Sequence, residues 1–358
     1  MNDAGTKANV DTRAAARPIP ASMRVNVLQE AGVMRLEQRP VPTAGVGEAL
    51  IQVGSVGICG SDVHYYRHGR IAEHVVRSPL VLGHEAGGLI VDVGPGVDAG
   101  RIGQRVALEP GVPCRLCREC KSGRYNLCPD VQFFATPPVD GAFAEYVAIA
   151  ADFAHRIPDS ISDDGAGLIE PLAVGVWACS KAGIGPGSSV LITGAGPIGL
   201  MNVQVAKAMG ATTIVVSDVA PQRLTTASRF GATRVLNARE EDAASVGIQV
   251  DAFIDCSGAE IAVRSGIRAV RPSGTVVLVG MGADDLSLPI GVVQGRELTI
   301  TGTFRYANTY PTAIALAESG RIQLDAMVTA TFGLADAESA LNQGDDPAAI
   351  KTVVRPGE

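Results

Sequence analysis

The chain has 358 residues, which is long enough for two domains that each bury a core. Its composition is 46% hydrophobic and 19% charged, as in packed globular proteins and unlike disordered ones. The 30 lysines and arginines against 37 aspartates and glutamates give a net charge of −7, so the chain lacks the basic character of nucleic-acid-binding proteins. No apolar run reaches the length of a membrane span, and we expect neither a nucleic-acid nor a membrane partner.

The N-terminal part of the sequence divides into a short tail and a long segment of strand-like runs. Residues 1–22 are small and polar and lack the apolar core of a secretion signal, so we expect a flexible tail. Residues 23–172 carry many glycines and prolines between short β-branched runs, such as ALIQVGSVGI and GLIVDVG. Short strands between turn residues predict a mainly β domain.

Three short segments of this β-rich part contain an unusual mixture of polar side chains. ICGSDVH holds Cys59, LGHEAGG holds His84 and Glu85, and LIEPLAVG holds Glu170. Thiolate, imidazole and carboxylate groups are zinc ligands in proteins, and three protein ligands leave a fourth position for water or substrate. A lone histidine is more often a satisfied core residue, but three donor types in glycine-rich turns favour a catalytic zinc site.

Four further cysteines follow the pattern C-x2-C-x2-C-x7-C, which is typical of tetrahedral zinc. Disulfides or an iron–sulfur cluster are the alternatives, and a loop of charged side chains without another redox motif argues against a cluster. All four donors come from the protein, so we expect a structural zinc at Cys114, Cys117, Cys120 and Cys128. Five of the seven cysteines thus fall in metal-ligand patterns, which indicates a reducing, cytoplasmic setting.

From residue 173 to residue 303 the pattern changes to apolar strands that alternate with helices. Strands are expected at 188–194, 212–218, 250–258 and 274–280, and amphipathic helices at 197–210 and 223–230. Such a βαβ series predicts a doubly wound parallel sheet with helices on both faces. The remaining segment, 304–358, holds further helices and a terminal strand, and we expect it to return to the first domain.

A G-x-G-x-x-G motif occurs where the first of these strands meets the first helix. The motif alone is a weak signal, but a strand before it and a helix after it form the context in which it binds a dinucleotide. Its backbone can approach a pyrophosphate at the helix N-terminus, where free N–H groups are available. The residues expected to contact the cofactor here are Gly194, Gly196, Pro197, Ile198 and Gly199.

Asp218 ends the next strand and indicates which dinucleotide binds. A carboxylate at this position accepts hydrogen bonds from the ribose hydroxyls and repels a 2′-phosphate, so NAD is favoured over NADP. Arg223 could attract that phosphate, but with Asp218 present we assign Arg223 to the adenine side.

These segments together resemble the zinc-dependent medium-chain alcohol dehydrogenases. The similar motifs are C-G-S-D-x-x-H, G-H-E-A-G-G, the four-cysteine pattern and GAGPIG, and the resemblance covers nearly the whole chain after Met23. HYYRHGR, RYNLCP, ATPP and GTFRYANTYP are most similar to the polyol branch, which holds sorbitol (L-iditol) and xylitol dehydrogenases. The resemblance implies an α/β protein with a GroES-like β-rich catalytic domain, 23–172 with 304–358, and a Rossmann domain, 173–303.

The resemblance also implies the reaction and the metal ligands. The reaction is oxidation of a polyol secondary alcohol to a ketose, with hydride transfer to NAD. Cys59 and His84 match zinc ligands, and the third ligand is Glu85 or Glu170, with both kept as candidates. Asp62 matches the residue that orients the histidine ligand.

Other positions match residues that move the proton or contact the substrate and the nicotinamide. Ser61 and His64 match the proton relay of the family, and Glu170 belongs with them among the catalytic candidates. The substrate contacts implied by the resemblance are Tyr65, Glu170, Arg305 and Tyr306. The residues that match positions lining the nicotinamide half of the cofactor are Val279, Gly280, Met281, Thr303, Phe304 and Arg305.

The sequence leaves several alternatives open. A zinc dehydrogenase acting on a vicinal diol or a hydroxy amino acid is the first, and a non-catalytic cofactor-binding protein on the same fold is the second. The polyol and its stereochemistry depend on a few pocket side chains. The resemblance implies a homotetramer, with a homodimer as the alternative.

Overall fold

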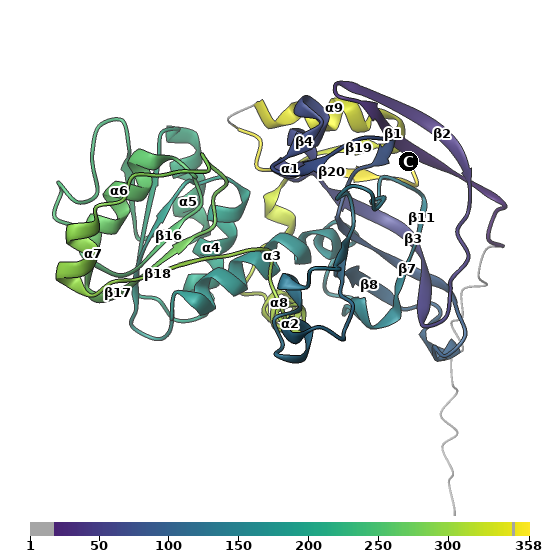
Figure 1. The fold of residues 1–358 in the computed structure, drawn as a ribbon, viewed down its shortest axis with the longest axis horizontal. Helices are drawn as coiled ribbons and strands as arrows, with labels where there is room; N and C mark the ends of the chain where they lie inside the picture. The colour runs from purple at the N-terminus through teal and green to yellow at the C-terminus, as the bar shows by residue number, and fades with distance from the viewer. Residues whose placement is uncertain (1–17, 346–347) are drawn as a thin grey trace, which may run out of the picture.

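The computed structural model describes residues 18–345 and 348–358, and these residues form two lobes that lie side by side (Figure 1). Of the tail expected at residues 1–22, residues 1–17 lie outside the described residues. Among the described helices, none combines the length and the apolar character needed to cross a membrane.

The first lobe is built on a seven-stranded sheet. Its strands lie in the order β12-β8-β7-β3-β20-β19, and β11 also pairs with β3. Their bounds are β3 Glu48–Gly57, β7 Glu85–Val93, β8 Arg105–Leu108, β11 Tyr146–Ala150, β12 Ala154–Arg156, β19 Val328–Gly333 and β20 Lys351–Arg355. Strands β19 and β20 come from the C-terminal end of the chain, so segments far apart in sequence share one sheet.

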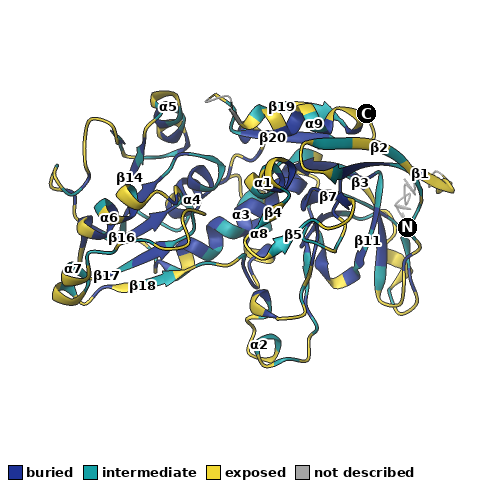
Figure 2. Ribbon diagram, turned by 45° about the horizontal axis from the view of Figure 1, so that its top comes forward, coloured by how far each residue is buried: buried dark blue, intermediate teal, exposed yellow. Residues whose placement is uncertain are grey.

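Smaller elements surround this sheet. A three-stranded sheet in the order β2-β1-β6 shares its apolar core, because Val27 and Leu28 pack in one cluster with Ile51, Ile90 and Phe143. The elements are β1 Ser22–Glu30, β2 Val33–Pro40, β6 Leu80–Val81, β4 Arg70–Ile71, β5 His74–Val75, β9 Gly111–Val112, β10 Gln132–Phe133, α1 Gly60–His68, α2 Arg118–Lys121 and α9 Ala337–Asn342. The loop that carries α2 projects from the lobe and is largely exposed (Figure 2).

The second lobe contains a six-stranded sheet in the order β15-β14-β13-β16-β17-β18. Every neighbouring pair is parallel, which confirms the doubly wound sheet predicted from the alternating pattern. The strands are β13 Ser189–Thr193, β14 Thr213–Asp218, β15 Arg234–Asn237, β16 Val250–Asp255, β17 Val270–Leu278 and β18 Thr299–Gly302. The helices are α4 Pro197–Ala208, α5 Pro221–Phe230, α6 Glu260–Ala269 and α7 Ile290–Arg296.

The apolar strands of this sheet are buried on both faces. Val190 and Ile192 of β13 belong to the core cluster that includes Leu200 of α4, whereas Leu191 belongs to the cluster that includes Ile267 of α6. Successive side chains of a strand point to opposite faces of the sheet. Helices cover both faces of a parallel sheet, so its strands are apolar throughout and do not alternate apolar with polar residues.

Helix α3, Asp163–Lys181, connects the two lobes and contacts β7 of the first and α4 of the second. Ser162 is its N-cap, with a side chain that accepts a hydrogen bond from Gly165 N, and the helix continues without a break through residue 172. Helix α8, Tyr310–Glu318, packs beside it. Glu170 therefore lies on a rigid element at the junction of the lobes.

Helix α3 and strand β7 lie so close together that one added methyl group between them should destabilise the protein. A Cβ at Gly87 would lie 2.3 Å from the Cβ of Ala166, so Gly87→Ala should overpack this contact and lower the free energy of unfolding by about 1–3 kcal/mol. Denaturant unfolding measures the effect. Gly185→Ala is the control, because no atom lies within 4 Å of the added methyl group. Equal stability of the two variants would show that α3 does not pack this closely.

Candidate metal and cofactor site

The pairing of two strands brings three candidate metal ligands together. Gly57, the last residue of β3, is opposite Glu85, the first residue of β7. Cys59 follows β3 by two residues and caps helix α1, and His84 immediately precedes β7. One ligand atom from each of Cys59, His84 and Glu85 lies within 4.8 Å of the others, whereas Glu170 is not part of that group.

Asp62 is fully buried and is hydrogen-bonded to the backbone on both sides of the ligand group. Its carboxylate accepts hydrogen bonds from Cys59 N at 3.0 Å and Gly83 N at 2.9 Å, and its Oδ1 lies 3.6 Å from His84 Nδ1. Burial alone would raise the pKa of Asp62, but His84 and the two N–H groups outweigh it and lower the pKa. Asp62 therefore remains a carboxylate next to the imidazole, as its expected orienting role requires.

Lys351, which the sequence analysis did not single out, is buried against the same group. Its Nζ lies 2.5 Å from Glu85 Oε1 and donates to Ile58 O at 2.7 Å, and both side chains of the pair are at most 3% exposed. A buried carboxylate needs a counter-charge, and Lys351 supplies one across 266 positions of sequence. The only local signal was a lysine that begins the otherwise apolar strand run KTVV.

A glycine leaves the space that the Glu85 carboxylate occupies. A Cβ at Gly57 would lie 2.2 Å from Glu85 Oε2, so any larger residue there would displace the carboxylate. A thiolate, an imidazole and a carboxylate in one buried group form a donor set that fits zinc. The residues present therefore fit the metal expected from the sequence.

Glu170 and three other candidate residues lie next to this group. Tyr306 donates a hydrogen bond from its hydroxyl to Glu170 Oε1 at 2.7 Å, and both side chains are buried. Burial raises the pKa of Glu170 to about 7. The Arg305 guanidinium lies 3.7 Å from the ring centroid of Phe133, and Tyr65 is buried near Arg305 and His84. The structure thus brings the four expected substrate contacts near the ligand group.

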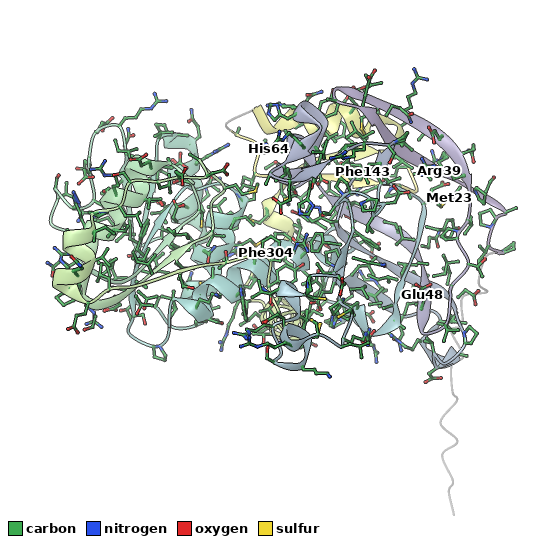
Figure 3. The ribbon with its side chains drawn as sticks, viewed as in Figure 1. Met23, Arg39, Glu48, His64, Phe143 and Phe304 are labelled. Atoms are coloured by element: carbon green, nitrogen blue, oxygen red, sulfur yellow. The ribbon has the colours of Figure 1, made fainter. Side chains whose placement is uncertain are left out.

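The two residues of the expected proton relay differ in exposure. Ser61 lies half-buried in the first turn of α1, and His64 lies exposed one turn farther, with its ring 5.5 Å from that of His68. Within the described residues no hydrogen bond joins Ser61 to His64. Figure 3 labels His64 and Phe304 where the two lobes meet.

The four cysteines of the loop 114–128 form a second candidate metal group. One sulfur from each lies within 4.8 Å of the others, and the sulfurs of Cys117 and Cys120 are 3.4 Å apart. Backbone N–H groups point at the sulfurs, as from Cys120 N to Cys117 Sγ at 3.4 Å. The N–H groups of Leu116 and Cys117 lower the pKa of the Cys114 thiol to about 7, which favours the thiolate that zinc binds.

The G-x-G-x-x-G motif forms the turn between β13 and α4. Gly194 has a φ of +87°, and a Cβ at Gly199 would lie 1.8 Å from Gly194 O, so neither position accommodates a side chain. Gly196 caps α4 at its N-terminus, and a Cβ there would meet nothing within 4 Å. Pro197 and Ile198 form the first turn of the helix. Open space beside free N–H groups fits a pyrophosphate.

Asp218 lies at the end of β14, beside this turn. Its carboxylate accepts hydrogen bonds from Ala195 N at 2.7 Å and Ala220 N at 2.8 Å, which fixes its orientation. Arg223 and Ala195 line one cavity of about 530 Å³. The arrangement places a fixed negative charge where the cofactor ribose is expected.

The expected nicotinamide-side residues follow the ends of β17 and β18. Asp255 O accepts hydrogen bonds from Val279 N and Gly280 N, each at 2.9 Å, and Thr303 N donates to Leu278 O at 2.9 Å. Met281 and Phe304 are exposed by 60% and 52%, which is unusual for large apolar side chains. A planar cofactor ring would cover such surfaces.

Comparisons with known proteins identify the family of the chain. Residues 45–159 match the family described as "Alcohol dehydrogenase GroES-like domain", and residues 197–319 match "Zinc-binding dehydrogenase". "Sorbitol dehydrogenase" of Bacillus subtilis (strain 168) is 44% identical over 332 residues, which cover 91% of this chain and 94% of that protein.

The chain belongs to the zinc-dependent medium-chain dehydrogenases, and within them to the polyol branch. "Probable D-xylulose reductase A" of Neosartorya fischeri is 41% identical, with 92% and 95% of the two chains covered. A solved Escherichia coli "oxidoreductase/dehydrogenase of unknown specificity" aligns with a TM-score of 0.89 at 36% identity, covering 93% and 99% of the two chains. The comparisons confirm the expected GroES-like and Rossmann fold class, and members of this family use zinc and a nicotinamide cofactor.

The buried pair of Lys351 and Glu85 gives a test in metal-free protein. Lys351→Met leaves the carboxylate buried without a counter-charge, so the free energy of unfolding should fall by about 3–5 kcal/mol. The Glu85→Gln/Lys351→Met double variant removes both charges and should recover part of this loss. Denaturant unfolding of the wild type, the two single variants Glu85→Gln and Lys351→Met, and the double variant measures the coupling energy between the two side chains. Strict additivity of the two single changes would contradict the pairing.

Proposed function

We propose that this protein oxidises a secondary alcohol of a polyol to a ketose and transfers the hydride to NAD. One observation carries the proposal: a thiolate, an imidazole and a carboxylate lie together beside the polar group formed by Glu170, Tyr306 and Arg305. Relatives named sorbitol dehydrogenase and D-xylulose reductase support a polyol as the substrate class.

We assign the catalytic zinc to Cys59, His84 and Glu85. Of the two candidate glutamates, Glu85 belongs to the group within 4.8 Å, which supports it as the third ligand. When bound, zinc supplies Lewis-acid chemistry that makes an alcohol proton easier to remove, and NAD supplies a two-electron acceptor. Glu170, with a pKa of about 7, is suited to hold or release a proton near neutral pH.

The chain's own residues orient the substrate and carry the proton away. Arg305 presents donors toward the hydroxyls of a polyol, and Tyr65 adds another. The Tyr306 hydroxyl donates to Glu170, so its oxygen is available as an acceptor. Ser61 lies half-buried and His64 exposed on the same helix, an order that suits a path from a dry site to water. His64 then releases the proton to solvent, because its side chain is exposed.

We also propose features beyond the reaction. The four cysteines hold a structural zinc, because their donor set leaves no position for substrate. The chain divides into a catalytic domain, 23–172 with 304–358, and a cofactor domain, 173–303. It assembles as a homotetramer, with a homodimer as the alternative, and acts in the cytoplasm. Strand β18 is an edge of its sheet among the described residues, so it offers an unpaired edge for assembly.

A panel of substrates tests the proposed reaction. NADH formation is followed with four- to six-carbon polyols and with simple vicinal diols, with and without a zinc chelator. We expect turnover of one or two polyols that the chelator abolishes. Protein that holds zinc and binds NADH but oxidises only diols, or none of the panel, would refute the polyol assignment.

Cys59→Ala separates the metal site from the cofactor site. The change removes one ligand, so turnover should fall to background, whereas NADH binding should persist because the glycine turn lies on the other lobe. Fluorescence titration with NADH and a zinc determination measure the two effects. Loss of NADH binding in a variant with an unchanged melting temperature would contradict the assignment.

Asp218→Ala tests the preference for NAD. Removing the carboxylate abolishes its hydrogen bonds to the ribose and its repulsion of a 2′-phosphate, so we expect KM for NAD to rise roughly 10- to 100-fold and the preference over NADP to shrink. Asp98→Ala is a matched control, because its carboxylate also accepts a backbone N–H, from Gly100 at 2.9 Å, but in the first lobe. An unchanged cofactor preference would mean that Asp218 does not face the ribose.

A further inference from the structure

The four-cysteine loop (residues 114–128) is hydrogen-bonded to the segment that carries two of the substrate candidates (residues 304–308, here the substrate segment). Asn126 Nδ2 donates to Phe304 O at 2.8 Å, and Asn308 Nδ2 donates to Gly123 O at 2.9 Å. Tyr125 Oη accepts from Asn308 N at 2.7 Å. A loop with no expected part in the chemistry therefore holds the backbone around Arg305 and Tyr306.

The substrate segment needs such support. Arg305 and Asn308 have φ values of 54° and 59°, in the left-handed region that non-glycine residues rarely adopt. Backbone of this kind is maintained only where surrounding contacts over-determine it, and it is frequent at ligand sites. The contacts from the four-cysteine loop thus fix the direction in which the Arg305 side chain leaves the chain.

A cavity of about 10 Å³ lies between the loop and the segment. A volume of this order holds one water molecule or one hydroxyl oxygen. The cavity is lined by Glu109, Gly111, Tyr125, Asn126, Val131, Phe133, Arg305 and Tyr306. It therefore adjoins the Tyr306–Glu170 pair of the proposed active site.

Two of the lining residues carry buried polar atoms that have no hydrogen-bond partner among the described residues: Asn126 Oδ1 and Arg305 Nη1. Asn126 is 6% exposed, and its amide orientation is set because the Nδ2 group faces the carbonyl of Phe304. One free atom is an acceptor and the other a donor. Buried polar atoms in native proteins nearly always have partners, so this pair calls for a ligand.

The charges around the cavity identify the class of ligand. The carboxylate of Glu109 disfavours an anion, and its two oxygens are already bound by Tyr125 Oη at 2.6 Å and His155 Nε2 at 2.8 Å. The guanidinium of Arg305 disfavours a cation. A neutral O–H group, which both donates and accepts, satisfies Asn126 Oδ1 and Arg305 Nη1 together.

We propose that Asn126 and Arg305 form a subsite for one hydroxyl group, and that Asn126 is a specificity-determining residue for the length and hydroxylation of the substrate. The inference rests on the proposed polyol substrate and deepens it. The occupant is a hydroxyl of the substrate remote from the reacting carbon, and a fixed water is the other source of the same chemistry. The four-cysteine loop thereby contributes directly to substrate selection.

Asn126→Leu tests the subsite, because it keeps a side chain of similar size but removes the acceptor. In the holoenzyme we expect kcat/KM for a five- or six-carbon polyol to fall about five- to tenfold relative to that for butane-2,3-diol, which lacks remote hydroxyls. If the diol is not oxidised, we measure its inhibition constant against the polyol in place of its kcat/KM, and Asn126→Leu should leave that constant unchanged. Asn342→Leu is the matched control, because Asn342 is exposed on α9, and it should leave both substrates unaffected.

Tyr125→Phe separates the subsite from the support of the backbone. It removes the bonds to Asn308 N and to Glu109 Oε1 but leaves Asn126 in place, so its effect should be similar for polyol and diol. If Tyr125→Phe shows the same selective loss as Asn126→Leu, movement of the substrate segment explains both, and the subsite is refuted.

A high-resolution crystal structure of the wild-type protein and of Asn126→Leu distinguishes the two sources of the hydroxyl. Selective loss of polyol turnover identifies a substrate hydroxyl as the occupant. An ordered water in the wild-type cavity without selective loss identifies water as the occupant and refutes the role of Asn126 in specificity. No selective loss and no water would overturn the subsite itself. If wild-type protein oxidises no polyol, the proposed function fails, and the crystal structures alone decide whether the cavity binds a hydroxyl.

Discussion

The antiparallel pairing of β3 with β7 is the constraint on which the rest of the site depends. The register places Glu85 opposite Gly57. Cys59 and His84 lie just outside the paired residues and so become neighbours of Glu85. This proximity concentrates ionisable groups in a buried space, so each needs a fixed partner. Asp62 lies beside the imidazole, and Lys351 offsets the charge of Glu85 from a strand at the far end of the sequence.

Much of this arrangement was predictable because its parts are local in sequence. The glycine turn with its strand and helix, the four-cysteine loop and the donors near Cys59 each lie in short motifs whose chemistry follows from residue type and spacing. Partners that depend on tertiary packing gave no such signal. Lys351 reaches Glu85 across 266 positions, and Asn126 meets Phe304 across 178, so only the folded chain shows that Lys351 and Asn126 lie beside the predicted site residues.

The proposed substrate side depends on three segments that converge from different parts of the chain. Helix α3 carries Glu170 between the lobes, the substrate segment supplies Tyr306 and Arg305, and the four-cysteine loop holds that segment through Asn126. A metal in the four-cysteine loop would therefore act on specificity through structure, by fixing the loop that fixes the segment. Such coupling gives the loop a physical role in the reaction without any part in the chemistry.

We propose that Cys59, His84 and Glu85 hold one zinc and that the four cysteines hold another. Anomalous diffraction at the zinc edge, on crystals of the purified protein, tests it most directly because it locates each metal and its ligands. We predict two sites per chain, one bound by one sulfur, one nitrogen and carboxylate oxygen of Glu85, and one by four sulfurs. A single site at the four cysteines, or Glu170 in place of Glu85 as a ligand, would contradict it.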